Sequence, residues 1–306
     1  MIGHDGIIVT LGRCDDMRAE VFVRFARNGC HGTTLTGTIT GPRRGRDTTL
    51  PATARLVAVP DEGGVSDLAR AVLTEPAFWT PELPNRYRVE ACLSSPHGED
   101  VRLDAWIGLR RLGVRGRSFW LDGRRWVLRA VVDGTDVVAA RMGDVGLAVP
   151  AGDDAVLVQA DEVGVAMVAI LGHGDVSPAR VASLSAHPSV LLAIIDVPSG
   201  IDADVVTAVR RASGTMQLGR AVDGTSPPSG LDDQVDFLAV TLPEGEHPHE
   251  AWRAGASVPL VAWRRRSEGE AHGRDACLAL QRDLASWRLE GHGDQSSWEW
   301  AGYLVG

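Results

Sequence analysis

Cysteine is scarce in this sequence, and its spacing suits neither a disulfide framework nor a zinc site. The 306 residues contain four cysteines, Cys14, Cys30, Cys92 and Cys277, with no Cys-x-x-Cys pair and no histidine at zinc spacing. Free thiols of this kind are typical of a reducing compartment. A Gly-rich phosphate loop is also missing, so we expect neither a metal ion nor a cofactor.

Long apolar runs and an excess of positive charge are missing as well. The best apolar run, residues 163–171, is half the length that spans a bilayer, and the N-terminus has no basic region or cleavage site of a signal peptide. We therefore expect a cytoplasmic protein without a membrane partner. The net charge of -9 argues against a nucleic-acid partner, and the basic stretch 110–126 is interpreted as a solvated linker or hairpin.

The first third of the chain has the pattern of an all-β domain. Hydrophobic residues make up 44% of the sequence and charged residues 23%, so the chain has enough apolar surface to form a core. Apolar and polar residues alternate with period two in short segments separated by Gly, Pro and Asp. These segments are 7–13, 19–27, 34–40, 52–59, 87–94 and 101–109. The pattern predicts an immunoglobulin-like β-sandwich over residues 5–112.

After residue 115 strand-like and helix-like segments alternate. We expect strands at 126–132, 136–141, 165–171, 190–196, 215–218, 237–242, 260–264 and 302–305, and helices at 154–164, 177–187, 202–214 and 273–287. Eight strands that alternate with helices predict a compact (β/α)8 TIM barrel over residues 118–306, so the chain is multidomain. A doubly wound open sheet is the rival interpretation, but it lacks support without a Gly-rich loop.

Several motifs resemble the family 2 glycoside hydrolases, the family of β-galactosidases and β-glucuronidases. The segment EPAFWTPELPNRYRVEACL, residues 75–93, resembles a strand of that family's immunoglobulin-like domain. Gly108-x-Arg110, ADEVGVAM (160–167), HPSVLLAII (187–195), SVPLVAW (257–263) and EWAGYLVG (299–306) follow in the family's order. The resemblance implies the same sandwich and barrel. The family's jelly-roll sugar-binding domain has no counterpart here, and a domain encoded upstream of Met1 is one explanation.

The residues that the family uses for catalysis are replaced. The resemblance aligns Pro198 with the general acid/base and Val197 with the asparagine before it. Arg264, next to Trp263, aligns with the nucleophile. Retaining hydrolysis needs two carboxyl groups about 5–5.5 Å apart, and neither proline nor arginine supplies one. The resemblance therefore implies a glycosidase fold that has lost catalysis.

Two function classes stay open, and the sequence does not decide whether the protein is an enzyme. A pseudoenzyme would bind a carbohydrate, an anionic small molecule or a protein partner. Arg264 would bind an anionic group through its paired N–H donors, and Trp263 would stack against a sugar ring. Alternatively, Arg264 pairs internally with Asp196 or Asp236, or belongs to the solvated run Arg264, Arg265 and Arg266. An active O-glycosyl hydrolase would need relocated acids, for which Asp196 and Glu244 are the candidates. His173 and Arg141 complete the candidate ligand-binding residues.

Overall fold

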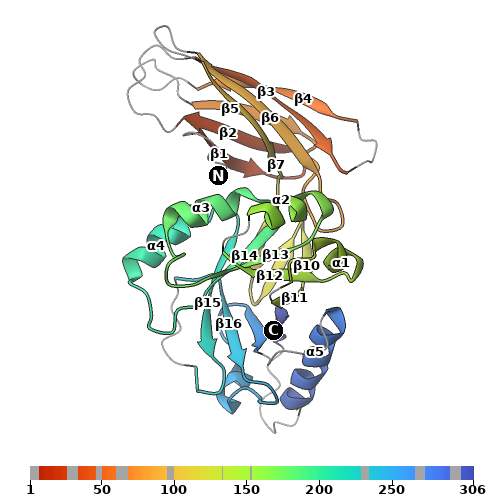
Figure 1. The fold of residues 1–306 in the computed structure, drawn as a ribbon, viewed down its shortest axis with the longest axis vertical. Coiled ribbons are helices and arrows are strands. Elements are labelled where there is room, and N and C mark those ends of the chain that lie inside the picture. Colours follow the sequence, from red (N-terminus) through yellow and green to blue (C-terminus); the bar gives the residue numbers. More distant parts are fainter. Residues whose placement is uncertain are drawn as a thin grey trace.

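A computed structural model describes most of the chain. The described residues are 7–25, 34–45, 50–59, 68–94, 100–132, 134–151, 154–228, 234–265, 273–289 and 298–306. A β-sandwich forms one end of the molecule and a barrel forms the other (Figure 1). None of the described helices is long and apolar enough to span a bilayer.

The N-terminal domain is an antiparallel sandwich with the strand order of an immunoglobulin-like fold. Its strands are β1 (Ile7–Cys14), β2 (Arg18–Phe25), β3 (Thr34–Arg43), β4 (Ala52–Ala58), β5 (Leu68–Thr74), β6 (Arg86–Ser94) and β7 (Val101–Ile107). They are hydrogen-bonded in the order β1-β2-β5-β4-β3-β6-β7, and β4 pairs with both β3 and β5. This order corresponds to the A-B-E-D and C-F-G sheets of immunoglobulin domains. The predicted sandwich is confirmed, although the sequence did not reveal β5.

A tyrosine fixes the corner where β6 begins. The hydroxyl of Tyr87 accepts a hydrogen bond of 2.8 Å from the backbone N–H of Ala77, and the ring is 2% exposed. Immunoglobulin-like domains use a tyrosine at the start of the same strand in this way. Burial raises the pKa of Tyr87, so the hydroxyl is neutral at all ordinary pH values.

A three-stranded meander closes the end of the barrel at which the parallel strands begin. It comprises β8 (Leu112–Arg115), β9 (Ser118–Leu121) and β10 (Arg124–Trp126). Phe119 on β9 is fully buried, and its ring meets that of Phe237 inside the barrel edge-on, with the ring centres 5.4 Å apart. The basic stretch 110–126 therefore includes this β-meander, which supplies apolar side chains to the barrel interior.

The C-terminal domain is a closed parallel barrel of β11 to β18. The strands are β11 (Leu128–Val132), β12 (Gly146–Pro150), β13 (Met167–Leu171), β14 (Val190–Ile195), β15 (Gln217–Asp223), β16 (Phe237–Leu242), β17 (Leu260–Arg264) and β18 (Gly302–Val305). The helical segments are α1 (Val137–Met142), α2 (Asp154–Val163), α3 (Pro178–Ala186), α4 (Ala203–Ala212), the short 3-10 helix η1 (Glu250–Ala254) and α5 (Arg274–Leu289). The predicted barrel is confirmed, and the open sheet is excluded.

One predicted barrel strand is wrong. Residues 136–141 were expected to form a strand, but α1 occupies this stretch. The side chain of Asp136 caps the helix by accepting a hydrogen bond from the N–H of Ala139, and Val137 and Ala140 are buried at helical spacing. The second strand of the barrel is β12, which the sequence did not reveal.

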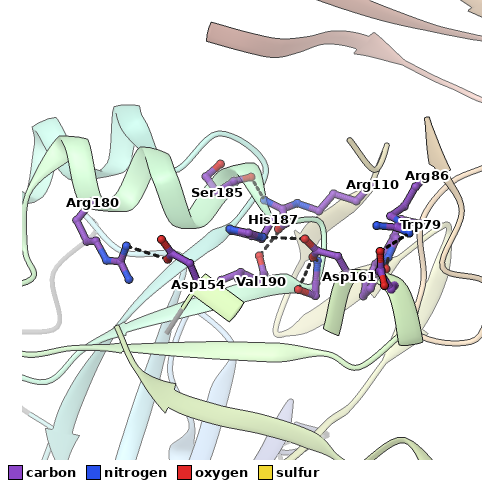
Figure 2. Close-up of polar contacts among 11 residues, drawn as sticks. Trp79, Arg86, Arg110, Asp154, Asp161, Arg180, Ser185, His187 and Val190 are labelled. Atoms are coloured by element: carbon purple, nitrogen blue, oxygen red, sulfur yellow. Dashed lines mark hydrogen bonds and ion pairs between the residues drawn. The ribbon is translucent and has the colours of Figure 1, made fainter. Parts of the chain in front are cut away.

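Buried polar contacts join the sandwich side of the molecule to the barrel (Figure 2). Arg110, which follows β7, is 3% exposed and donates hydrogen bonds to the carbonyl oxygens of Ser185, His187 and Val190 and to the hydroxyl of Thr215. Burial lowers the pKa of Arg110 to about 10, so the guanidinium stays charged at neutral pH. The three carbonyls offset the cost of burying this charge.

A buried carboxylate organises the same junction. Asp161 of α2 accepts hydrogen bonds from the backbone N–H and the hydroxyl of Ser189, and its other oxygen lies 2.7 Å from Nδ1 of His187. The indole N–H of Trp79 donates to the carbonyl oxygen of Asp161. These contacts place an Asp, a His and a Ser together, but the serine hydroxyl bonds to the carboxylate and not to the histidine. The cluster therefore stabilises the junction and does not form a nucleophilic triad.

Candidate functional site

The largest described cavity lies at the barrel mouth, at the carboxyl ends of β14 to β17. Its volume is about 910 Å³. The arrowheads of β15 and β16 point away from the sandwich, so the mouth opens at the far end of the molecule (Figure 1). Its polar and charged lining residues include Asp196, Arg220, Asp223, Ser226, Thr241, Glu244 and Arg265. Ligand sites of TIM barrels lie at this end of the strands, and the volume is that of a small-molecule site.

Strand alternation decides which side chains reach this cavity. On β14, Leu192 and Ile194 pack in the barrel interior, so Asp196 continues the inward row beyond the end of the strand. On β17, Val261 and Trp263 are the inward residues. The next inward position after Trp263 is residue 265, and the cavity is indeed lined by Arg265.

Asp196 and Arg265 form an ion pair across the mouth. One terminal nitrogen of Arg265 lies 2.8 and 2.7 Å from the two carboxylate oxygens of Asp196. The guanidinium also lies over the ring of Trp263, 4.5 Å from the ring centre. The pair joins the ends of β14 and β17, the two strands at which the sequence resemblance places the replaced carboxylate positions. Both oxygens of Asp196 therefore contact the same guanidinium.

Arg264 lies outside this cavity, in a different position from the one expected. Its side chain is 10% exposed and pairs with Asp283 of α5 at 2.8 Å, while Nη2 donates to the carbonyl oxygen of Glu246. Burial alone would raise the pKa of Asp283, but hydrogen bonds from His247 and Arg264 lower it below the usual range. Arg264 therefore pairs internally, as one interpretation of the sequence supposed, but with Asp283 and not with Asp196 or Asp236.

The partners first considered for Arg264 are used elsewhere. Asp196 pairs with Arg265, and Asp236 pairs with Arg210 of α4 at 2.7 Å. Trp263 is 4% exposed, its indole N–H donates to the carbonyl oxygen of Gly306, and Arg265 covers one face of its ring. The ring thus has no open face for a sugar. Arg266 lies outside the described residues.

The other candidates fall into two groups. Pro198 and Glu244 are exposed and line the cavity together with Asp196, as the sequence suggested. His173 lies in an exposed turn after β13 and is not among the lining residues. Arg141 belongs to α1 and lines a different cavity, because the predicted strand that carried it is a helix. The sequence predictions for Asp196, Glu244 and Pro198 therefore converge on one place, and those for His173 and Arg141 do not.

Asp223 is the acidic residue that sequence reasoning missed. It ends β15, one of the strands that line the cavity. Hydrogen bonds from the hydroxyl of Ser226 and from the hydroxyl and backbone N–H of Thr225 lower the pKa of Asp223. The predicted strand stopped at Leu218, five residues too early. Gly219, Ala221 and Asp223 share the inward phase of β15, and this alternation was the available signal.

The lining is slightly acidic. It contains three acids, Asp196, Asp223 and Glu244, and two arginines, Arg220 and Arg265. Among the described residues, no cluster of three or more His, Cys, Asp or Glu side chains is arranged to hold a metal ion. Cys14, Cys92 and Cys277 are free thiols, and Cys30 lies outside the described residues.

Comparison with known proteins reveals likeness at the level of structure. No protein-family model and no curated protein matches the chain. Among solved structures, the Lactobacillus rhamnosus β-glucuronidase has a TM-score of 0.66 at 13% identity, over 98% of this chain and 60% of that one. The Ruminococcus gnavus β-glucuronidase in complex with D-glucuronic acid has a TM-score of 0.64 at 13% identity, over 98% and 60% of the two chains. A glycosyl hydrolase family 2 member from Bacteroides cellulosilyticus has 0.63 at 16% identity, over 98% and 45%.

At these identities the likeness establishes a shared fold. The chain has the immunoglobulin-like sandwich and TIM barrel of family 2 glycoside hydrolases, as its motifs suggested. It spans about half the length of the structures it matches, between 45% and 60% in these three cases.

Proposed function

We propose that this protein is a non-hydrolytic relative in fold of the family 2 glycoside hydrolases, and that its barrel mouth binds a neutral carbohydrate. The ion pair between Asp196 and Arg265 is the observation that carries the proposal. It occupies the ends of the two strands on which a hydrolase of this fold needs its carboxylates. A guanidinium in that place can neither attack a sugar nor accept a proton at working pH.

The remaining acids do not replace the lost pair. Asp223 has a lowered pKa because Ser226 and Thr225 donate hydrogen bonds to it, so it stays ionised and is a poor proton donor. A retaining mechanism requires one carboxyl group that is protonated and one that is free to attack. Glu244 is exposed, whereas a general acid of this kind is typically enclosed in apolar surroundings.

The same groups suit the binding of hydroxyl-rich molecules. The carboxylates of Asp223 and Glu244 accept hydrogen bonds from hydroxyl groups, and Arg220 and Arg265 donate them. Pro198 and Pro243 add apolar surface to the lining. Because acids outnumber arginines here and Arg264 is turned away, we expect a neutral sugar to bind better than a glucuronate.

Titration calorimetry with oligosaccharides tests the binding. We expect heats with neutral oligosaccharides of two or three units and weaker heats with glucuronate-containing ones. Glu244→Gln and Asp223→Asn should each weaken binding roughly tenfold, because each replaces a charged acceptor. Glu246→Gln is the matched control, since Glu246 is exposed nearby but does not line the cavity. Absent heats across the neutral panel, or equal affinities for all four proteins, would remove the proposal.

The alternative is an active glycosidase with relocated acids. It is favoured by one observation, that Asp196, Asp223 and Glu244 all line one cavity. Turnover of an aryl glycoside that is lost on Asp196→Asn or Glu244→Gln distinguishes it from the binding function.

A further inference from the structure

A second cavity, away from the mouth, is rich in arginine. Its volume is about 330 Å³, and it lies beside the starts of β11, β12 and β13, at the barrel end opposite the mouth. Its charged lining residues are Glu82, Arg125, Arg129, Arg141, Asp144 and Arg274. Four guanidinium groups therefore face two carboxylates in a protein whose net charge is -9. This local reversal of sign requires an explanation.

Two of the four arginines are neutralised by acids. Arg274 pairs with Asp144, so this acid does not compensate the charge of another arginine in the lining. Arg125 pairs with Glu299 at 2.5 Å. Arg129 and Arg141 remain, and within the described part of the chain neither contacts a carboxylate. The only other acid of the lining is Glu82, which is exposed.

Arg129 is the less well compensated of the two. It extends from β11, is partly buried, and one terminal nitrogen donates to the neutral amide oxygen of Gln281 at 3.1 Å. Its Nε is buried and has no hydrogen-bond partner among the described residues. Removing a guanidinium from water without an opposite charge is costly. An anion in the cavity would offset that cost.

We propose that this cavity binds a phosphate dianion, either inorganic phosphate or a phosphomonoester of a small molecule, through Arg129 and Arg141. Guanidinium groups bind phosphate oxygens through paired N–H donors, and two of them match a double negative charge. The volume leaves room for part of an organic group beside the phosphate. The site is independent of the carbohydrate function proposed for the mouth.

The simpler explanation is that Arg141 serves only its own helix. It stands in the last turn of α1, where a positive charge compensates the helix dipole. That role requires no ligand and predicts no anion binding. It also leaves Arg129 unexplained, because Arg129 is on a strand.

Calorimetry with inorganic phosphate, a hexose 6-phosphate and the unphosphorylated hexose tests the proposal. Both phosphates should bind at constant ionic strength, and the hexose and chloride should not. Arg141→Gln and Arg129→Gln should each raise the dissociation constant roughly tenfold or more. Arg102→Gln is the control, because Arg102 is exposed on β7 and does not line the cavity. Tighter binding of the hexose phosphate would identify a phosphomonoester as the ligand, and equal binding would identify phosphate itself.

Two further readouts keep the result unambiguous. Affinity should fall as the pH drops below about 6, where a phosphomonoester loses its second charge. Arg141 is on the surface of a short helix, so Arg141→Gln will fold even if Arg129→Gln does not. Equal affinities of the wild type and Arg141→Gln, or heats that chloride reproduces at the same ionic strength, would overturn the proposal.

Discussion

Removal of the Asp161 carboxylate should destabilise the barrel more than any surface change on the same helix. Asp161 is 7% exposed, and it accepts hydrogen bonds from the N–H and hydroxyl of Ser189 and contacts Nδ1 of His187 (Figure 2). Asp161→Ala leaves these three groups without their partner in a largely dry environment. Each buried unsatisfied group costs about 1–3 kcal/mol, and partial relaxation brings the expected total to about 3–5 kcal/mol.

Thermal unfolding followed by circular dichroism measures this loss. For a domain of this size 1 kcal/mol corresponds to about 2–4 °C, so the melting temperature of Asp161→Ala should fall by roughly 6–20 °C. Asp161→Asn keeps one oxygen acceptor and should lie between the alanine variant and the wild type. Asp154→Ala is the control, because Asp154 is exposed on the same helix and contacts Arg180 at 3.3 Å. A surface pair contributes about 1 kcal/mol or less. An Asp161→Ala protein that melts within 2 °C of the wild type would refute the reasoning.

Three further predictions concern other parts of the molecule. Arg110→Met should lower the melting temperature far more than Arg115→Met, because it leaves three carbonyls of the domain junction without a donor, whereas Arg115 is exposed over an aromatic ring. Gly219→Ala should lower the free energy of unfolding by about 1–3 kcal/mol, since the added Cβ would lie 2.4 Å from a buried phenyl ring. The Cβ of Gly113→Ala on β8 meets nothing within 4 Å, so this control should leave the stability unchanged, and equal unfolding midpoints of the two variants would contradict the prediction. The pKa of Asp283 is lowered in the folded state, so the stability that it contributes is present above about pH 4 and is lost as the pH falls through its folded pKa. Asp283→Asn should therefore be less stable than the wild type at pH 7 in urea unfolding, and the difference should shrink as the pH falls below about 4. A difference that does not change with pH over this range would argue against the ion pair.

The barrel was largely predictable from the sequence because most of its strands are continuous apolar runs between turn residues. Residues 237–242, 260–264 and 302–305 were predicted with the observed bounds. β12 was missed because its run is only five residues long, begins with Gly146 and ends with Pro150, two residue types that are typical of turns. The adjacent valines of residues 136–141 favour a strand, but the cap at Asp136 overrides that preference and α1 forms.

The site was predictable in position but not in detail. Motif order located the mouth and the ends of β14 and β17, but it could not tell which side chains turn inward. Trp263 and Arg264 are adjacent, so on a regular strand they cannot share a face. Because Trp263 faces the interior, Arg265 lines the mouth and Arg264 points outward, where it pairs with Asp283. The partner of a charged side chain depends on packing between distant segments, which a single sequence does not reveal.

The loss of hydrolysis is the central claim, and one measurement tests it most directly. Purified protein at high concentration is incubated with aryl β-galactosides and aryl β-glucuronides, and release of the phenol is followed over hours. With Asp196 held by Arg265, we expect release equal to that of a control carrying both Asp223→Asn and Glu244→Gln, and no faster than in buffer. Release that exceeds the control and disappears in the Asp196→Asn or Glu244→Gln protein would contradict the account.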